Sequence, residues 1–174
     1  MSRIDIKNPY LDMQYTYDLA DLRSVEREYE KGAEHDSIYD FLLLNKDRFK
    51  YALYMLNTAK LPFYRQNDYW VTFLVTPDEY LDDSMKEMIT NLSKLEMVNL
   101  IKYNTITKAL DLKYIQNTSV SYQPSLYRNE TFFFSANNGN FLVNNQAQVR
   151  EQIRLPHATI LIVDKVVFPS VFGI

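Results

Sequence analysis

The feature that most constrains the fold is a change of hydrophobic period along the chain. Between residues 37 and 103, apolar residues recur mostly at helical spacing, interrupted by the run 69–75, which is rich in β-branched and aromatic residues. The final third instead has strand patterns at 130–136, 141–143 and 159–168. Helices followed by a β-rich end predict an α+β fold, as opposed to alternating βαβ units.

Asn138 and Gly139 form the clearest turn signal in the sequence. They separate the strand patterns 130–136 and 141–143, and an Asn-Gly pair tolerates the positive φ angles of a tight hairpin turn. The sequence therefore predicts a β-hairpin centred on these two residues.

A helix start is predicted at Thr76, Pro77 and Asp78. Threonine is a capping residue, and proline is favoured at the first helical position. The carboxylates of Asp78 and Glu79 would lie beside the positive end of the helix dipole. We expect a structural role for this segment.

Asp164 interrupts the apolar run 159–168. An unpaired charge inside a buried strand is strongly destabilising, so this carboxylate must have partners. We expect a hydrogen bond to a backbone amide or a turn hydroxyl that fixes the terminal strand. The substitution Asp164→Asn should therefore lower the thermal stability of the protein.

The N-terminal 36 residues differ from the remainder. Up to Tyr17 the segment is polar and aromatic with no helical or strand period, and we interpret it as an arm. Residues 18–31 have apolar side chains at three- and four-residue spacing among charged ones, which predicts a short amphipathic helix. The predicted organisation is an arm and helix at 1–36, a globular domain at 37–170, and a C-terminal tail at 171–174.

Composition and charge exclude several classes of function. The 174 residues include no cysteine, so disulfide scaffolds, zinc-thiolate sites and cysteine nucleophiles are excluded. The formal net charge of -3 argues against a nucleic-acid partner. No apolar run is long enough to span a membrane, and the first 30 residues have no apolar stretch typical of a secretory signal.

No group of residues indicates catalysis. His35 is followed by Asp36 and Ser37, but residues adjacent in sequence cannot converge on one carbonyl as a catalytic triad does. His157 directly precedes a strand and is expected in a loop or at an edge. We predict no catalytic residue, no cofactor and no small-molecule substrate.

Paired carboxylates are the remaining candidate for a metal site. Asp78 and Asp82 have the four-residue spacing that would place them on one helix face, but the glycine turn and the further oxygen ligands of a calcium loop are absent. Compensation of the helix dipole on a solvated face is the favoured interpretation, and no metal is expected.

Three segments resemble the fasciclin-like domain family. Residues 71–80, VTFLVTPDEY, resemble a buried strand that leads into a Pro-Thr-Asp-Glu-aromatic helix start. Residues 100–104 fall where the family has an apolar helix end followed by Tyr-His, and 141–149 with 160–169 resembles its second signature. The match covers 37–169. It implies an α+β wedge with a β-sandwich core, helices packed on one side, and a role in adhesion or protein contact without catalysis.

The chain departs from the family pattern at several positions, which makes it resemble a divergent member. Asn104 replaces the histidine of the Tyr-His pair, so binding through an imidazole is not expected. Asn145 occupies a position where glycine is usual, and asparagine tolerates positive φ. Leu161 replaces the histidine of the last strand.

The favoured hypothesis is a non-enzymatic structural protein that binds other proteins within a larger assembly. Candidate contacts are the aromatic arm, the amphipathic helix and an exposed edge at Tyr103-Asn104. The residues assigned to these contacts are Tyr10, Leu11, Met13, Tyr15, Tyr17, Leu22, Tyr29, Tyr103 and Asn104. The composition favours an intracellular or virion setting, such as a minor capsid or cement protein of a large virus.

Two alternatives stay open. The first is a cell-surface or secreted adhesion protein whose leader has been removed, for which the glycosylation triplets at Asn91, Asn117 and Asn129 would be informative. The second is an enzyme or a small-ligand binder.

Overall fold

The computed structural model describes residues 37–61, 70–114, 120–128, 130–137 and 139–169. The α-helices among these residues are α3 (Ile38–Leu44), α4 (Lys50–Ala59), α5 (Asp83–Asn91) and α6 (Lys94–Tyr103). The strands are β1 (Val71–Val75), β2 (Thr105–Ile106), β3 (Val120–Pro124), β4 (Thr131–Asn137), β5 (Asn140–Val143), β6 (Ala147–Arg154) and β7 (Ala158–Val163). Single 3₁₀ turns lie at η2 (Asp78–Tyr80) and η3 (Leu112–Tyr114). The α+β prediction is confirmed.

The strands form one seven-stranded mixed sheet in the order β2-β1-β7-β6-β5-β4-β3. Strand β1 runs parallel to β7, with Val71 opposite Ala158 and Val75 opposite Ile162. The other strand pairs are antiparallel. The early strand and the terminal strands therefore share one interior, as the sequence predicted.

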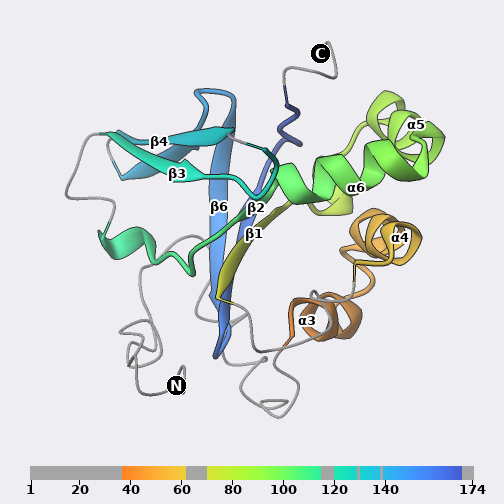
Figure 1. Ribbon diagram of the computed structural model, residues 1–174, viewed down its shortest axis with the longest axis horizontal. Helices are drawn as coiled ribbons and strands as arrows, with labels where there is room; N and C mark the ends of the chain where they lie inside the picture. The colour runs from red at the N-terminus through yellow and green to blue at the C-terminus, as the bar shows by residue number, and fades with distance from the viewer. Residues whose placement is uncertain (1–36, 62–69, 115–119, 129, 138, 170–174) are drawn as a thin grey trace.

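The sheet bends back until its two end strands meet. An antiparallel bridge joins Ile106 to Ser125, directly after β3, and the Leu126 amide donates to the Thr105 carbonyl at 2.7 Å. Figure 1 shows β3 and β4 lying across the end of the sheet that holds β6 and β1, with the helices on one side. The two layers expected of a sandwich core thus belong to a single, nearly closed sheet.

The two faces of β1 and β7 are covered by two different apolar clusters. Phe73, Ile160 and Ile162 face a cluster that includes α3 and α4. Leu74 and Leu161 face a second cluster inside the bent sheet, which includes Phe132, Phe134 and Val149. Because both faces are covered, β7 is buried along its whole length.

Side-chain caps define the helix starts. The Ser37 hydroxyl accepts from the Asp40 amide at 3.0 Å at the start of α3. Ser93 and Glu96 form a capping box at the start of α6, in which each side chain accepts from the other's amide. A turn at residues 45–48 separates α3 from α4.

The predicted helix start at Thr76-Pro77 is wrong. After Pro77 the chain makes only the single 3₁₀ turn η2, which has no side-chain cap. The Asp78 carboxylate instead accepts from the amides of Lys50 and Tyr51, at 2.9 and 3.1 Å, and so caps α4. Because Asp78 lies in η2 and Asp82 caps α5, they do not share a helix face.

The hairpin prediction is confirmed. Asn137 pairs with Asn140, and Gly139 has φ +83°, which L-residues with a side chain rarely adopt. Asn138 lies outside the described residues. In the next turn, Asn144 and Asn145 both have φ 54°, so the expectation that Asn145 takes the place of a glycine is also confirmed.

Asp164 has the backbone partner that the sequence predicted. One carboxylate oxygen accepts from the Gln148 amide at 2.9 Å, and the other pairs with Arg150 at 3.0 Å. Strand β7 ends at Val163, however, so the predicted strand extending to residue 168 is wrong. Asp164 fixes the end of β7 to β6 because it lies just beyond the strand.

Candidate protein-interaction surface

Tyr103 and Asn104 do not form an exposed edge, and the prediction that they do is wrong. Their exposed fractions are 3% and 6%. The Tyr103 ring lies 4.7 Å from Phe132 between ring centroids, and its hydroxyl accepts from the Asn144 amide group at 3.1 Å. Burial raises the pKa of Tyr103, against the hydrogen bond from Asn144.

Asn104 has a structural role at the C-terminal end of α6. Its amide nitrogen donates to the carbonyls of Leu100 and Val167, at 3.0 and 3.1 Å, and so fastens the segment after β7 to the helix. The position of the Tyr-His pair in the resembled family is thus occupied here by two residues that are turned inward. Neither side chain is available to a partner.

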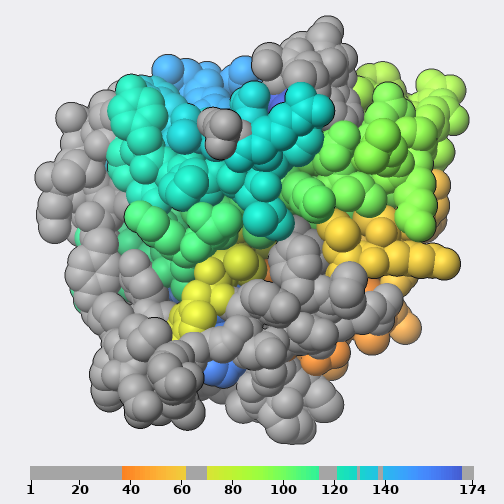
Figure 2. All heavy atoms as spheres, viewed as in Figure 1, coloured from red at the N-terminus to blue at the C-terminus, as the bar shows by residue number. Residues whose placement is uncertain are grey.

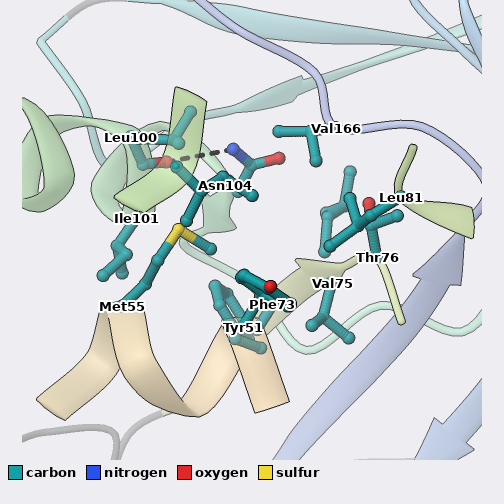
Figure 3. Close-up of a pocket in the computed structure, with 13 residues that line it drawn as sticks. Tyr51, Met55, Phe73, Val75, Thr76, Leu81, Leu100, Ile101, Asn104 and Val166 are labelled. Atoms are coloured by element: carbon teal, nitrogen blue, oxygen red, sulfur yellow. Dashed lines mark hydrogen bonds between the residues drawn. The ribbon is translucent and has the colours of Figure 1, made fainter. Parts of the chain in front are cut away.

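A small cavity lies beside Asn104, between α4, α6 and β1. Figure 3 shows Tyr51, Met55, Phe73 and Leu81 around it. Its volume is about 20 Å³, close to what one water molecule needs and far below the several hundred Å³ of a typical ligand pocket. This cavity is therefore no site for an organic ligand.

Asp111 and Arg154 form a buried ion pair inside the bent sheet. Their side chains are 0% and 4% exposed, and Arg154 Nη1 donates to Asp111 Oδ2 at 2.8 Å. Gln152 also donates to Asp111, at 3.2 Å, and accepts from the Leu112 amide at 2.8 Å. The ion pair holds segment 108–113 against β6. Because both side chains are buried, a substrate could not reach them.

Arg48 links three parts of the chain. Its guanidinium pairs with Glu151 of β6 at 3.0 Å and with Glu79 of η2 at 3.1 Å. Partial burial alone would lower the pKa of Arg48, but the hydrogen bonds and charges of the two glutamates outweigh it and raise the pKa. Both carboxylates are thus engaged in holding the loop before α4.

The described residues provide no metal-binding constellation. They contain no group of three or more His, Asp or Glu side chains that could hold an ion. His157 packs edge-on against Trp70 with ring centroids 5.1 Å apart, whereas His35 lies outside the described residues. None of the helices in the described part of the chain has the length and apolarity that crossing a membrane demands.

An aromatic pair, of which Tyr122 is exposed and Phe133 half-buried, lies on the outer face of the sheet. Tyr122 of β3 is 67% exposed and lies opposite Phe133 of β4, with ring centroids 5.4 Å apart. We call these two residues the aromatic outer face. Strands β3 and β4 cover a broad area of the upper surface in Figure 2. Tyrosine on a rigid sheet is typical of protein contact surfaces.

Strand β3 also has a partly open edge beside the aromatic outer face. It is the last strand in the sheet order and pairs with β4, but the Thr107 amide donates to its Pro124 carbonyl at 3.3 Å, so the edge is closed at Pro124. Phe133 directs its amide and carbonyl to Asn144, away from β3. Tyr122 lies directly opposite Phe133 in this register. In an antiparallel pair the two opposed residues direct their backbone groups either toward each other or both away, so the amide and carbonyl of Tyr122 point away from β4.

The inward side of the same edge has an unusual polar residue. Gln123 is 9% exposed and lies opposite the buried Phe132. Its amide group donates to Ser121 at 2.7 Å, but its carbonyl oxygen is buried without a hydrogen-bond partner among the described residues. A buried acceptor in this state is costly to the stability of the fold.

The predicted contact residues of the N-terminal region lie outside the described residues, namely Tyr10, Leu11, Met13, Tyr15, Tyr17, Leu22 and Tyr29. The sequence analysis missed Tyr122. A signal for it exists, because residues 120–124, VSYQP, alternate and end in proline, which is typical of an edge strand.

The shape of the sheet and its helix layer can be compared with known structures. The chain is similar to the FAS1 domain pair from the insect cell adhesion molecule fasciclin I, with a TM-score of 0.62 over 80% of this chain. This chain has a fasciclin-like fold. The two sequences are 10% identical, so the likeness concerns the fold, and the match spans 53% of the fasciclin I chain.

No protein-family profile matches the sequence, and no curated protein matches it either. The fasciclin-like fold is therefore recognised from the arrangement of strands and helices. It was also predictable from the three sequence segments that resemble the family.

Proposed function

We propose that this chain is a non-enzymatic protein-interaction module whose contact surface is the aromatic outer face of β3 and β4. The observation that carries the proposal is the exposure of Tyr122, 67%, on a strand at the end of the sheet. Tyrosine is among the residues enriched at the energetic centres of interfaces. The fold supports the proposal, because the similar solved structure belongs to a cell adhesion molecule.

The polar residues that could perform chemistry support the same proposal. The buried charges Asp111 and Arg154 pair with each other, and Arg48 pairs with Glu79 and Glu151. The cavity beside Asn104 is too small for a substrate. An enzyme or small-ligand binder stays the alternative, because a larger hollow of about 620 Å³ lies between Tyr80, Met85 and Gln146.

The size of the native complex tests the contact surface. Tagged wild-type chain, Tyr122→Ser and the matched control Tyr54→Ser would be produced in the native source and separated by size under native conditions. Tyr54 is also an exposed tyrosine, at 39%, but lies on α4. We expect wild type and Tyr54→Ser in a larger complex and Tyr122→Ser released from it. A monomeric wild type, or equal retention of both variants, would contradict the proposal.

The setting of the module is a second, finer proposal. We infer a structural subunit of an intracellular or virion assembly, such as a minor capsid or cement protein, and the tyrosine-rich, cysteine-free composition supports it. A secreted or cell-surface adhesion protein is the alternative. Asn91 decides between them, because it is exposed at the end of α5 within an Asn-Leu-Ser triplet. A glycan on Asn91 of native protein, found by mass spectrometry, would favour the alternative.

A further inference from the structure

The hollow of about 620 Å³ lies where three segments far apart in the sequence meet. Its walls come from η2 with the start of α5, from the turn between β5 and β6, and from residues 164–168 after β7. Its volume falls within the range of about 300–1,000 Å³ that binding pockets in proteins have. Both apolar and charged side chains line it, so its chemistry can be compared with that of possible occupants.

The inner wall of the hollow is apolar. Leu81 is 7% exposed, and Met85 and Val166 are half-buried. Leu81 and Val166 also line the small cavity beside Asn104, so these two side chains separate the two spaces (Figure 3). Protein interiors are normally close-packed, but this cavity leaves room behind the wall for a bulky group to press against it. Because thioethers make favourable contacts with rings, Met85 suits an aromatic occupant.

Two charges at the hollow are available to an occupant. Asp82 is exposed, and its Oδ1 accepts from the Met85 amide at 2.8 Å, while its Oδ2 has no hydrogen-bond partner within the described ranges. Lys165 is also exposed and forms no ion pair with another described residue. The carboxylate of Asp164, in contrast, is already paired with Arg150 at 3.0 Å. The hollow therefore offers one free anion and one free cation.

An extended polypeptide that carries an aromatic residue between a basic and an acidic one is complementary to these features. In an extended segment, alternate side chains lie on one side, and the first and fifth residues are about 13 Å apart. The basic side chain would pair with Asp82 and the acidic one with Lys165. The exposed amide side chains of Asn145 and Gln146 supply both donors and acceptors for the backbone of the segment.

The turn between β5 and β6 connects the hollow to the aromatic outer face. The Asn144 amide donates to the Phe133 carbonyl at 2.7 Å, and its side-chain oxygen accepts from the Phe133 amide at 2.8 Å. The next two residues, Asn145 and Gln146, line the hollow. A polypeptide that leaves the hollow past this turn reaches Phe133 and Tyr122. This continuity favours a polypeptide over a small molecule, which would end within the hollow.

We propose that this hollow binds an extended segment of a partner protein, with an aromatic side chain against Met85, a basic residue at Asp82 and an acidic residue at Lys165. The inference rests on the proposed function only for the existence of a protein partner. It adds a second site to the aromatic outer face and states what chemistry the partner carries. Binding at this site is measurable on the purified full-length chain.

A synthetic peptide of sequence Lys-Ser-Phe-Ser-Asp, blocked at both ends, is the probe. Three matched peptides each lack one feature: Lys-Ser-Ser-Ser-Asp lacks the ring, Glu-Ser-Phe-Ser-Asp the cation, and Lys-Ser-Phe-Ser-Lys the anion. Fluorescence anisotropy of labelled peptides measures the affinities. We expect loss of the ring to weaken binding about tenfold or more, and loss of either charge about threefold.

The methionine methyl groups report where the probe binds. In NMR spectra of chain labelled with ¹³C at these methyl groups, the signal missing from Met85→Leu identifies Met85. We expect the ring of the probe to shift this signal in the wild-type chain. The signal of Met97, which is fully buried in α6 and does not line the hollow, is the internal control and should not move.

Variants of the hollow test the same contacts from the side of the chain. Asp82→Asn keeps the cap of α5, since asparagine caps as well as aspartate, and should weaken the probe about threefold. Asp83→Asn is the same change at an exposed neighbour that does not line the hollow, and it should have less effect. Met85→Ser should weaken the probe about tenfold, and Leu95→Ser, on the exposed side of α6, should not. Circular dichroism checks that each variant is folded.

Several results would overturn the proposal. These are no binding of the probe, equal affinity for the probe and the matched peptides, or an unshifted Met85 signal. Binding that appears only after residues 170–174 are removed would assign the hollow to the chain's own tail. A wild-type dimer that Met85→Ser dissociates would assign it to a second copy.

The proposed function and this inference can fail separately. Tyr122→Ser should bind the probe like the wild-type chain, because Tyr122 does not line the hollow. A native complex that survives Tyr122→Ser, together with the expected probe binding, would contradict the aromatic outer face and support the hollow. A native complex lost in Tyr122→Ser, with no binding of the probe, would overturn the hollow alone.

Discussion

Strands β7 and β3 belong to one sheet but have opposite surroundings. Every residue of β7 is buried, with the helix-side cluster on one face and the inner cluster on the other. Strand β3 lies at the end of the sheet, where its edge is closed at Pro124, and it carries an outward Tyr122 that is 67% exposed. Strand β7 contributes to stability through both of its faces, whereas the outer face of β3 contributes little to the core. Stability and binding should therefore respond to different substitutions.

The largest expected effect lies at the enclosed ion pair. Asp111→Ala should lower the free energy of unfolding by about 3–5 kcal/mol, because it removes the buried carboxylate that pairs with Arg154 at 2.8 Å. Urea unfolding measures the change. Arg150→Ala is the control, since its pair with Asp164 is partly exposed and should be worth less than about 1 kcal/mol. Equal losses would contradict the distinction between enclosed and open charges.

The two faces of β7 should be about equally important. Leu161→Ala opens a cavity inside the bent sheet and Ile160→Ala opens one beneath the helices, and each should cost about 2–5 kcal/mol. Urea unfolding of both variants checks this expectation. A loss below about 1 kcal/mol for either variant would mean that one face of β7 is not a true core.

The helix layer that encloses β7 should depend on the cap supplied by Asp78. Asp78→Ala removes the acceptor for the amides of Lys50 and Tyr51 and should cost about 0.5–2 kcal/mol. Thermal unfolding is a sufficient measurement. Asp83→Ala, an exposed acidic residue in the first turn of α5, is the matched control and should have the smaller effect. The reverse ranking would refute the capping role of Asp78.

The smallest effect on stability is expected on strand β3. Tyr122→Ser removes a cross-strand contact with Phe133 and should cost about 0.2–1 kcal/mol. Phe134→Ala, on the inward face of the neighbouring strand, should cost about 3–5 kcal/mol. Chemical denaturation of both variants makes the comparison. A large loss for Tyr122→Ser would show that the aromatic outer face belongs to the core.

Much of the fold was predictable because its local signals agree with its tertiary structure. Gly139 needs its positive φ, and the apolar run at β1 has no other explanation than burial. Strand β6 was missed because it carries Arg150, Glu151, Gln152 and Arg154. Two of these charges are balanced by residues far away in sequence, Arg48 and Asp111, and such pairing has no local signature.

The contact residues were harder to predict than the fold. Tyrosine occurs both on surfaces and in cores, so the residue type alone did not reveal the burial of Tyr103. The bend of the sheet places its ring against Phe132 and Tyr127. Asp78 was predicted to compensate the dipole of a helix that follows it, whereas it caps α4, whose target amides lie 27 and 28 positions earlier in the chain. Exposure of Tyr122 likewise depends on which strand ends the sheet.

The placement of β7 in the middle of the sheet has a consequence for biosynthesis. This strand is the last in sequence, yet it lies between β1 and β6 and connects them. Until β7 has been translated, β1 and β6 have no strand between them. The apolar side chains of β1 and of strands β3 to β6 then lack the cover that β7 provides. Cooperative folding of the sheet therefore requires residue 163 to have left the exit tunnel.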